Sequence, residues 1–590
     1  MRAGLLVALV ALVACGDVLA QRRRITPPPS DQARATLRFD RPVHWLGENI
    51  LAHFCVGNGG RDPFTISVGG DYRGASRFLR FKVTVTDDRG RVVPDPDPIP
   101  FNLGGLGFSP QIEPGGEWCQ SLPLMRYARI DDPGVYTVSV VHDLGWPDGL
   151  APKAQARLTV AMPSASEAEQ VVAAMEALPP AENNMGGRVS PPFKDFSSLR
   201  YPVYLAPLGR RANSGSIDAV AGIGAVPTVD ATRALISLLD REDRTLTRQA
   251  AAQLAMRLPD PALSGQLSVR GPFSNELTEP RKYLVSVGWR DELADDVRRA
   301  GVRLLASTDS VDVRSGAFFL EAVGRPEERD AVVTALTRAI ERTLTEPRET
   351  GVRPTPRGAA EELLRAAEIL VARGAVPVSP PRAPGEIAFW LVALSRRPSE
   401  DGWQQILSSA ARHPIAYVRR LAMESLPRDR AAEVAGEIAA NLSSDDVDAQ
   451  IAACITAREA GVTSLGPPAA AALAKATEPF QLDVCWPAAL SLGARGVAVD
   501  ALVSRLADPA LGTDALRLLL DLFGPSSGMS GLMFDAKAFA ALVPRWRAFV
   551  DANRDVIVSG ATLTLDDPRV APDLVPRGLR IRREGKPDWP

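Results

Sequence analysis

A recurring arginine motif is the feature that most constrains how this chain can fold. The arginine is followed two positions later by a small residue and six positions later by leucine. The three copies are Arg248–Ala250–Leu254, Arg314–Gly316–Leu320 and Arg420–Ala422–Leu426. They lie 66 and 106 residues apart, close to two and three multiples of a unit of roughly 33 to 35 residues. A unit of this length suits a pair of helices, in which small residues allow close packing and leucines fill the seam.

The stretch around the first copy, TRALISLLDREDRTLTRQAAAQLAMRL, resembles HEAT-like repeats. This resemblance implies an α-solenoid, which we expect over residues 196–534, and it implies that Arg248, Arg314 and Arg420 are scaffold residues near the start of a second helix. An arginine there can bond turn carbonyls or an acidic residue. Asp243 and Asp309 lie five residues before the first two arginines, but Ile415 takes that place before Arg420. The acidic partner is therefore missing from the third copy.

Further helix pairs are expected along the rest of the chain. We expect them at Glu386–Leu426, Ala431–Ala460, Pro467–Ala494 and Val497–Phe523. Residues 535–590 are expected to form a capping helix and tail that shield the last pair. The stretch Ala262–Trp289 interrupts the helical pattern, and both an irregular repeat and a functional loop remain open for it.

Residues 35–162 follow a different pattern, with a period of two. In FLRFKVTVTDDRG, the residues Leu79, Phe81, Val83 and Val85 alternate with polar side chains, which is the pattern of a half-buried strand. Several such runs are separated by turns rich in Gly, Pro and Asp. This part of the chain is therefore predicted to be an antiparallel β-sandwich.

Three motifs in this region, GENILAHFCVGN, IEPGGEW and DPGVYTVSVV, resemble bacterial immunoglobulin-like domains of the kind found in proteinase inhibitors and ahead of some metalloproteases. Asp132 to Val138 resembles the Asp-x-Gly-x-Tyr-x-Cys run of immunoglobulin-like folds, with Val138 where the cysteine would be. The resemblance implies that the Tyr136 hydroxyl bonds back to upstream backbone, and the departure removes the usual disulfide between sheets.

Residues 163–195 are expected to be a helix followed by a proline-rich linker. The helix would begin in SASEAEQVVAAMEAL, where Ser166 and Glu169 have the spacing of a capping box.

The first twenty residues have the pattern of a secretory signal. Arg2 precedes an apolar run, Leu5–Ala14, that is too short to span a bilayer. Cleavage after Ala20 would leave a soluble chain. Alternatively, Leu12 to Cys15 resembles the lipobox of bacterial lipoproteins, in which Cys15 would carry a lipid anchor. In both cases we expect an exported protein with no membrane span, either periplasmic or extracellular. In the second case it would be an outer-membrane lipoprotein.

The four other cysteines are suited to an oxidising compartment. Cys55 and Cys119 are expected on the outward side of neighbouring strands, where a disulfide can join them. Cys454 and Cys485 are expected on second helices of adjacent repeats, where we favour two buried thiols over a disulfide. There is no C-x-x-C motif, so neither zinc nor thioredoxin-like chemistry is indicated.

The motif search indicates no catalytic site and no cofactor. The histidines are His44, His53, His142 and His413, and there is no H-E-x-x-H zinc motif. Gly524 to Gly528 matches G-x-S-x-G by letter, but the expected helix before it is the wrong context for a nucleophile elbow. The acidic loops Asp87–Asp88 and Asp95–Asp97 are interpreted as solvent-exposed turns, with calcium binding as the alternative.

The net charge of −2 and the absence of a basic stripe with aromatic residues argue against nucleic acid as a partner. We therefore expect a non-enzymatic exported scaffold that binds one or more proteins through the surface of the helical repeats. One alternative is an envelope regulator or inhibitor-like module that acts through the immunoglobulin-like domain. A less favoured alternative is an unrecognised hydrolase.

Overall fold

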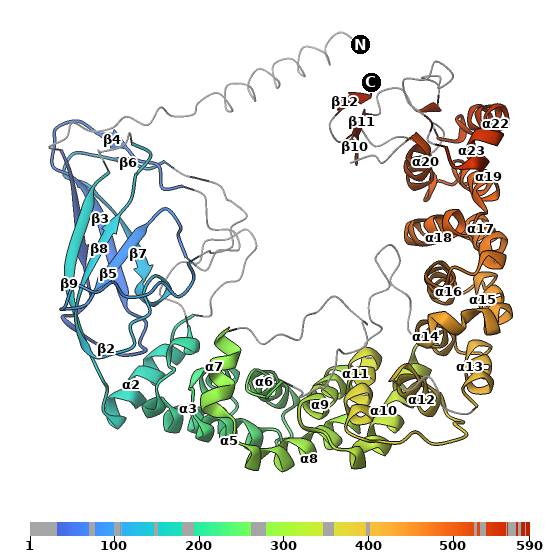
Figure 1. Cartoon of the computed structure of the whole chain (residues 1–590). Coiled ribbons are helices and arrows are strands. Elements are labelled where there is room, and N and C mark those ends of the chain that lie inside the picture. The colour runs from blue at the N-terminus through green and yellow to red at the C-terminus, as the bar shows by residue number, and fades with distance from the viewer. Residues whose placement is uncertain are drawn as a thin grey trace, which may run out of the picture. The chain divides into compact units, whose positions relative to one another are not determined.

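The computed structural model describes most of the chain between Gln32 and Trp589. The described residues are 32–69, 77–98, 107, 109–146, 151–179, 194–260, 279–345, 359–396, 402–523, 528–530, 539–561, 563, 574–575, 580–583 and 586–589. The chain divides into two compact units. Unit 1 takes in Met1–Arg257 and Thr278–Leu293, and unit 2 takes in Leu258–Leu277 and Ala294–Pro590. Unit 1 is a β region followed by helices, and most of unit 2 is helical (Figure 1).

Two sheets form most of the β region. The three-stranded sheet is antiparallel, with strand order β1 (Ala33–Arg38), β3 (Leu51–Asn58) and β7 (Glu117–Pro123). The four-stranded sheet has the order β2 (Val43–Trp45), β9 (Lys153–Ala161), β8 (Gly134–Val141) and β5 (Lys82–Thr86), with β2 parallel to β9 and the other pairs antiparallel. A short pair, β4 (Phe64–Thr65) and β6 (Gln111–Ile112), lies beside them.

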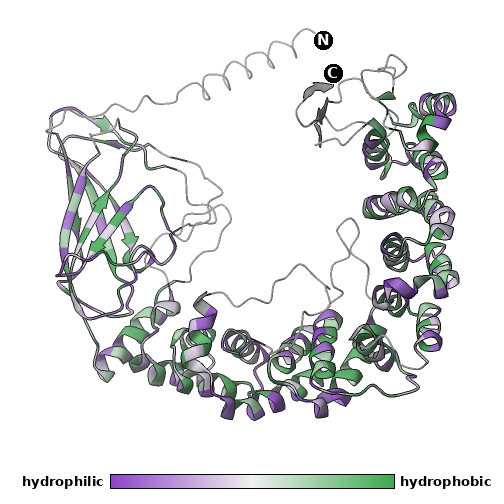
Figure 2. Cartoon of the chain, in the orientation of Figure 1, coloured by the Kyte–Doolittle hydropathy of each residue, from purple (hydrophilic) through white to green (hydrophobic). Residues whose placement is uncertain are grey.

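The two sheets share an apolar core. The ring of Phe54 on β3 lies 5.8 Å from the ring of Phe81, which immediately precedes β5. Phe81 and Val85 are buried while Lys82 is exposed, so the alternation predicted for this strand is confirmed. Figure 2 shows hydrophobic and hydrophilic residues alternating along the strands of this region. Packing of the apolar side chains thus fixes which face of each sheet is turned outward.

The tyrosine interaction implied by the sequence resemblance is present. The Tyr136 hydroxyl donates a hydrogen bond to the carbonyl oxygen of Asp132, four residues upstream, at 2.6 Å. Burial and the neighbouring Asp132 raise the pKa of the Tyr136 phenol, so the hydroxyl keeps its proton and can donate.

Unit 1 continues into a series of helices. They are α2 (Ala165–Glu176), α3 (Leu205–Asn213), α4 (Ile217–Ala225), α5 (Val229–Leu238), α6 (Arg244–Ala255) and α7 (Glu279–Gly288). The Tyr201 hydroxyl donates to the carbonyl of Ile130 at 2.7 Å, and the fully buried Tyr204 donates to the carbonyl of Leu46 at 2.5 Å. These bonds join the start of the helices to the β region within one unit.

The capping box of α2 differs from the prediction by two residues. Ser164 is the N-cap and accepts a hydrogen bond from the backbone N–H of Glu167, whose carboxylate accepts from the N–H of Ser164. Glu169, which was expected to close the box, instead pairs with Arg210 and Arg211 of α3. The sequence offers two Ser-x-x-Glu spacings, Ser164 with Glu167 and Ser166 with Glu169, so it did not decide between them. In the structure the arginines bind Glu169, which leaves Glu167 to form the capping box.

Most helices of unit 2 lie in two layers. The first-layer helices are α8 (Ala294–Leu305), α10 (Arg329–Arg342), α13 (Trp403–Ala411), α15 (Ala435–Leu442), α17 (Gly466–Lys475) and α19 (Arg495–Arg505). The second-layer helices are α9 (Ser310–Val323), α11 (Ala359–Ala372), α14 (Ala416–Ser425), α16 (Val447–Ala460), α18 (Pro479–Ser491) and α20 (Gly512–Leu520). Each first-layer helix packs on the second-layer helix that follows it (Figure 1). Helices also pack on their neighbours within a layer, except between α10 and α13 and between α11 and α14, where another helix makes most of the contacts.

The contacts between successive helix pairs have a nearly constant spacing in sequence. The Thr456 hydroxyl donates to the carbonyl of Met423, 33 residues away, and Arg505 donates to the carbonyl of Leu473, 32 residues away. The ammonium group of Lys475 donates to the carbonyl of Ser443, also at a separation of 32. This spacing is close to the predicted unit of roughly 33 to 35 residues.

One helix, α12 (Pro384–Arg396), breaks the pairing. It packs against α10, α11, α13 and α14, and its residues Ile387–Leu394 are all buried. A helix that is apolar on every side belongs inside the structure and not on its surface. Between Arg314 and Arg420 the chain therefore forms two helix pairs plus this single helix, so the 106-residue separation does not represent three equal units.

The end of the chain packs on the last helix pair. Helix α22 (Val543–Ala552) lies against α19 and is followed by α23 (Arg554–Ser559). Trp546 is fully buried beside Phe523 and Phe549, and its indole N–H donates to the carbonyl of Leu574 at 2.9 Å. A small antiparallel sheet is formed by β10 (Gly528–Ser530), β11 (Arg580–Arg583) and β12 (Lys586–Trp589).

Candidate functional site

The three motif arginines occupy the same helical position. Arg248, Arg314 and Arg420 are each the fifth residue of their helix, in α6, α9 and α14. The aspartates that precede two of them cap helices. Asp243 accepts the backbone N–H of Thr245 at 2.9 Å, and Asp309 accepts the N–H of Val311 at 2.9 Å.

Ile415 cannot cap α14 through its side chain. The Nδ1 atom of His413 instead accepts the backbone N–H of Ile415 at 3.1 Å. Burial and the nearby Arg419 lower the pKa of His413, which favours the neutral ring that this acceptor role requires. His413 thus has a local structural role.

Arg314 and Arg420 both pair with α11, at two consecutive glutamates. Arg314 Nε lies 3.2 Å from Glu362 Oε1, and Arg420 Nη2 lies 2.9 Å from Glu361 Oε1. The Arg314 side chain is 53% exposed and that of Arg420 is 13% exposed, so only the second pair is shielded from water. The two arginines hold second-layer helices together through pairs of very different burial.

Arg420 belongs to a buried group of four side chains. Its Nε atom donates to Glu424 at 2.8 Å, its guanidinium lies 5.4 Å from the centre of the Tyr417 ring, and the Tyr417 hydroxyl donates to Glu361 at 3.1 Å. Burial alone would lower the pKa of Arg420, but Glu424 and Glu361 raise it overall. Burial and Glu361 raise the pKa of Tyr417. The guanidinium stays charged and the phenol neutral, so this group suits holding helices and not proton transfer.

A second polar group lies on the outer face of the three-stranded sheet. We define this outer face by Arg38 on β1, His53 and Cys55 on β3, and Cys119 and Ser121 on β7. Cys55 lies directly opposite Cys119, and His53 lies opposite Ser121. The structure contains the predicted Cys55–Cys119 disulfide, with a Cα–Cα distance of 4.0 Å. Cys119 is exposed, whereas Cys55, on the central strand, is fully buried.

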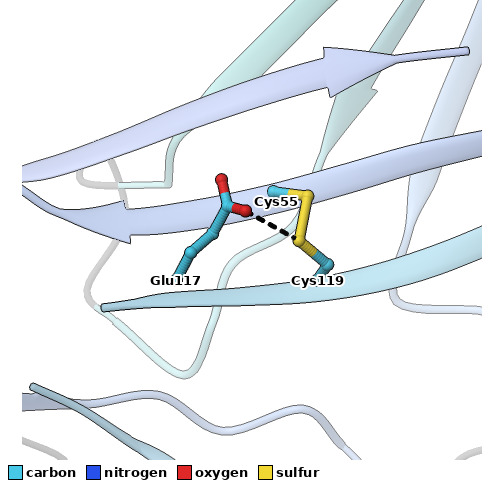
Figure 3. Close-up of side chains that lie close together, drawn as sticks. All are labelled: Cys55, Glu117 and Cys119. Atoms are coloured by element: carbon cyan, nitrogen blue, oxygen red, sulfur yellow. Dashed lines mark hydrogen bonds between the residues drawn. A yellow bond between two sulfur atoms is a disulfide. The ribbon is translucent and has the colours of Figure 1, made fainter. Parts of the chain in front are cut away.

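Charged side chains flank the exposed sulfur. An oxygen of Glu117 lies 3.2 Å from Cys119 Sγ, and Arg38 Nη2 lies 3.7 Å from the same sulfur. Figure 3 shows the Glu117 carboxylate beside the disulfide. Arg38 also pairs with Glu117 at 3.7 Å. Cys55, Glu117 and Cys119 are the one group of potential metal ligands found among the described residues. While the disulfide is intact neither sulfur is a thiolate, so the trio does not bind a metal in this state.

The neighbouring rung of the sheet forms a Ser–His–Asp hydrogen-bond chain. The Ser121 hydroxyl lies 2.8 Å from His53 Nδ1, and His53 Nε2 lies 2.9 Å from Asp40. A neutral imidazole can accept from the serine through one nitrogen and donate to the aspartate through the other. Acyl transfer would also need hydrogen-bond donors aimed at the developing oxyanion, so these three hydrogen-bonded side chains alone do not specify a hydrolase.

The two other histidines are buried. His44 Nδ1 lies 2.5 Å from Glu48, which also pairs with Arg41. His142 accepts the backbone N–H of Leu144 at 2.8 Å, and burial lowers the pKa of His142 to about 4. Both rings lie inside the β region and are not accessible to a substrate.

The acidic loops use their carboxylates within the protein. Asp95 accepts two hydrogen bonds from Arg77, at 2.6 and 2.7 Å, and these bonds lower the pKa of Asp95. Asp87 accepts the backbone N–H groups of Arg89 and Arg91 at 3.0 and 2.8 Å. These contacts are those of ordered turns, and they give no support to the calcium alternative.

Cys454 and Cys485 correct an expectation of two free thiols. They form a disulfide between α16 and α18, with a Cα–Cα distance of 5.2 Å, and both residues are fully buried. Their sequence separation is 31, close to the spacing of the other contacts between successive helix pairs. Equivalent positions on stacked helices thus bring the two sulfurs together.

Arg257 is a buried residue that the motif search missed. It has no exposed surface, and it donates to the carbonyl oxygens of Ile223 at 3.3 Å and Gly224 at 2.8 Å, and also to that of Val226. Burial lowers the pKa of Arg257 to about 10, so it is still charged near neutral pH. Its charge lies at the C-terminal end of α4, where the helix dipole favours a cation. No pattern in the sequence distinguishes it from exposed arginines.

Several sequence predictions concern residues outside the described ranges. They are the signal segment 1–20 with Cys15, the first part of the Ala262–Trp289 interruption, and Gly524–Ser527 of the G-x-S-x-G match.

No protein-family model matches the chain, and no curated protein matches it significantly. Among the helices that the structure describes, none has both the length and the apolar character needed to cross a membrane.

Proposed function

We propose that this protein is an exported, non-enzymatic binding protein. In this proposal, residues 35–162 are an immunoglobulin-like β-sandwich and residues 196–534 are a HEAT-like α-solenoid, whose second-layer helices bind another protein. The observation that carries the proposal is the regular spacing of contacts between successive helix pairs, such as Thr456 with Met423 and Lys475 with Ser443. Stacked helix pairs of this kind offer long surfaces for protein partners.

We take the second-layer helices as the candidate surface, since ion pairs join neighbouring helices along them. Arg314 of α9 meets Glu362 of α11, and Arg517 of α20 pairs with Asp483 of α18. The side chains in these pairs are partly exposed, except that Glu362 is largely covered. Charges held in place by a neighbour lose less conformational entropy on binding than free side chains do.

Two features support export and a binding role. The Cys55–Cys119 and Cys454–Cys485 disulfides are typical of proteins that fold in an oxidising compartment. The buried group around Arg420 keeps its protons, as a structural ion-pair network does. Neither the motif arginines nor the acidic loops combine a nucleophile with a base.

The test is site-specific photo-crosslinking in intact cells that produce the protein at native levels. A photo-reactive residue replaces exposed Arg458 on α16 or exposed Thr513 on α20. Exposed Ala440 on α15 and Ala471 on α17 are the matched first-layer controls. We expect the same adduct from both second-layer positions and none from the controls. Equal crosslinking from all four positions, or no adduct from any, would contradict the proposal.

A further inference from the structure

The two disulfides differ in how far a reagent can reach them. Both sulfurs of Cys454–Cys485 are buried between α16 and α18. In Cys55–Cys119 one residue is fully buried and the other is exposed on the outer face of the three-stranded sheet. Thiol–disulfide exchange requires a thiolate to approach one sulfur along the S–S axis, so access decides which bond reacts and at which sulfur.

We propose that Cys119 is a thiol-exchange site, at which a low-molecular-weight thiol forms a mixed disulfide. The incoming thiolate attacks Cys119 Sγ, and a new S–S bond forms as the bond to Cys55 breaks. Cys55 leaves as a thiolate and takes a proton from water. The reaction needs no other oxidant or reductant, because one disulfide replaces another. The step reverses when the Cys55 thiolate attacks Cys119 Sγ and expels the added thiol. If a second small thiol attacks the adduct instead, the two small thiols leave joined by a disulfide, and both cysteines are left reduced.

The residues around Cys119 determine which thiols react well. Arg38 places a positive charge 3.7 Å from the attacked sulfur, and Glu117 places a negative charge 3.2 Å from it. The Arg38 side chain is 61% exposed and the Glu117 side chain 41% exposed, so both can meet a ligand from solvent. Arg38 favours the approach of a thiolate and of a thiol that carries carboxylates, while Glu117 opposes it.

The sheet can tolerate the modification. Strands β3 and β7 stay paired by their backbone from Leu51 opposite Pro123 to Gly57 opposite Glu117, on both sides of the cysteine rung. Breaking the bond also leaves the apolar side chains on the opposite face of β3 in place. The site is therefore a modification site that does not require the β region to unfold.

The test is exchange of the folded, oxidised full-length chain with reduced glutathione, a tripeptide thiol that carries two carboxylates. Free thiols are trapped by alkylation at intervals, and peptides are mapped by mass spectrometry. We expect the glutathione adduct on Cys119 and the alkylated thiol on Cys55, with the Cys454–Cys485 bond reacting at least on the order of tenfold more slowly. An adduct on Cys55, equal rates for the two disulfides, or no adduct would overturn the proposal.

Two surface variants give readouts that a purely structural disulfide would not produce. Arg38→Gln is expected to slow exchange with glutathione by roughly fivefold, and Glu117→Gln to accelerate it by a similar factor at low salt. Both effects should shrink when cationic cysteamine replaces glutathione. Circular dichroism checks that each variant is folded. Identical glutathione rates in the wild type and both folded variants would contradict the proposed role of these charges.

Discussion

Replacing Arg420 with methionine tests whether the motif arginines stabilise the helix stack according to their burial. Arg420→Met keeps much of the apolar stem but removes the positive charge that pairs with the carboxylates of Glu361 and Glu424. Breaking a buried ion pair by removing one partner costs about 3–5 kcal/mol. Because the Arg420 side chain is still 13% exposed, we expect the lower end, about 3 kcal/mol.

Arg314→Met is the matched control. Arg314 occupies the same helical position and pairs with the adjacent glutamate, Glu362, but its side chain is 53% exposed. An exposed pair contributes about 0–1 kcal/mol, so the control should change stability by no more than that. The assay is native-state hydrogen exchange with mass spectrometry in a urea series, which reports the opening free energy of α11 and α14 peptides separately. The double variant Glu361→Gln/Arg420→Met should be more stable than the sum of the two single effects predicts. Equal losses for Arg420→Met and Arg314→Met, or additive effects in the double variant, would refute the reasoning.

Three further perturbations follow from the buried residues. Arg257→Met removes three hydrogen bonds to carbonyls at the end of α4 and takes from the Gly224 carbonyl the donor that the structure shows for it. The opening free energy of α4 and α5 peptides should therefore fall by about 3 kcal/mol by hydrogen exchange, against a change within about 0.5 kcal/mol for exposed Arg244→Met. His142 takes up a proton near pH 6.5 in the unfolded state but only near pH 4 in the folded state. The free energy of unfolding should therefore fall by up to about 3 kcal/mol as the pH drops between these values. Urea titrations at each pH should show a smaller fall for His142→Phe. The double variant Cys454→Ala/Cys485→Ala removes a bond that closes a loop with a sequence separation of 31. The free energy of unfolding of α16 to α18 should fall by about 3–4 kcal/mol, as measured by a denaturant titration followed by hydrogen exchange. An unchanged midpoint would show that the bond is dispensable.

Local patterns in the sequence predicted the parts of the fold that depend on periodicity. The alternation around Phe81 identified a strand, and the outward placement of two cysteines on neighbouring strands identified the Cys55–Cys119 bond. The Cys454–Cys485 bond could also have been found, because its separation matches the spacing of stacked helix pairs.

Contacts between distant residues that no periodic pattern marks could not be predicted. The choice between two Ser-x-x-Glu spacings in α2 was made by Arg210 and Arg211, which are far from it in sequence. No sequence pattern indicates that Arg257 is buried or that Arg420 is more shielded from water than Arg314. The burial of an arginine depends on which helix ends surround it in the fold.

The most direct test of the account is whether a defect in one helix pair affects only its neighbours. Leu482 of α18 is fully buried, and Leu482→Ala should cost about 2–5 kcal/mol locally. In native-state hydrogen exchange of the full chain, we expect faster exchange in α18 and in the helices that contact it, which are α16, α17, α19 and α20. Exchange in α8 and α9 should be unchanged. An equal loss of protection from α8 to α20 would show that unit 2 unfolds as one globule and would contradict a stack of helix pairs.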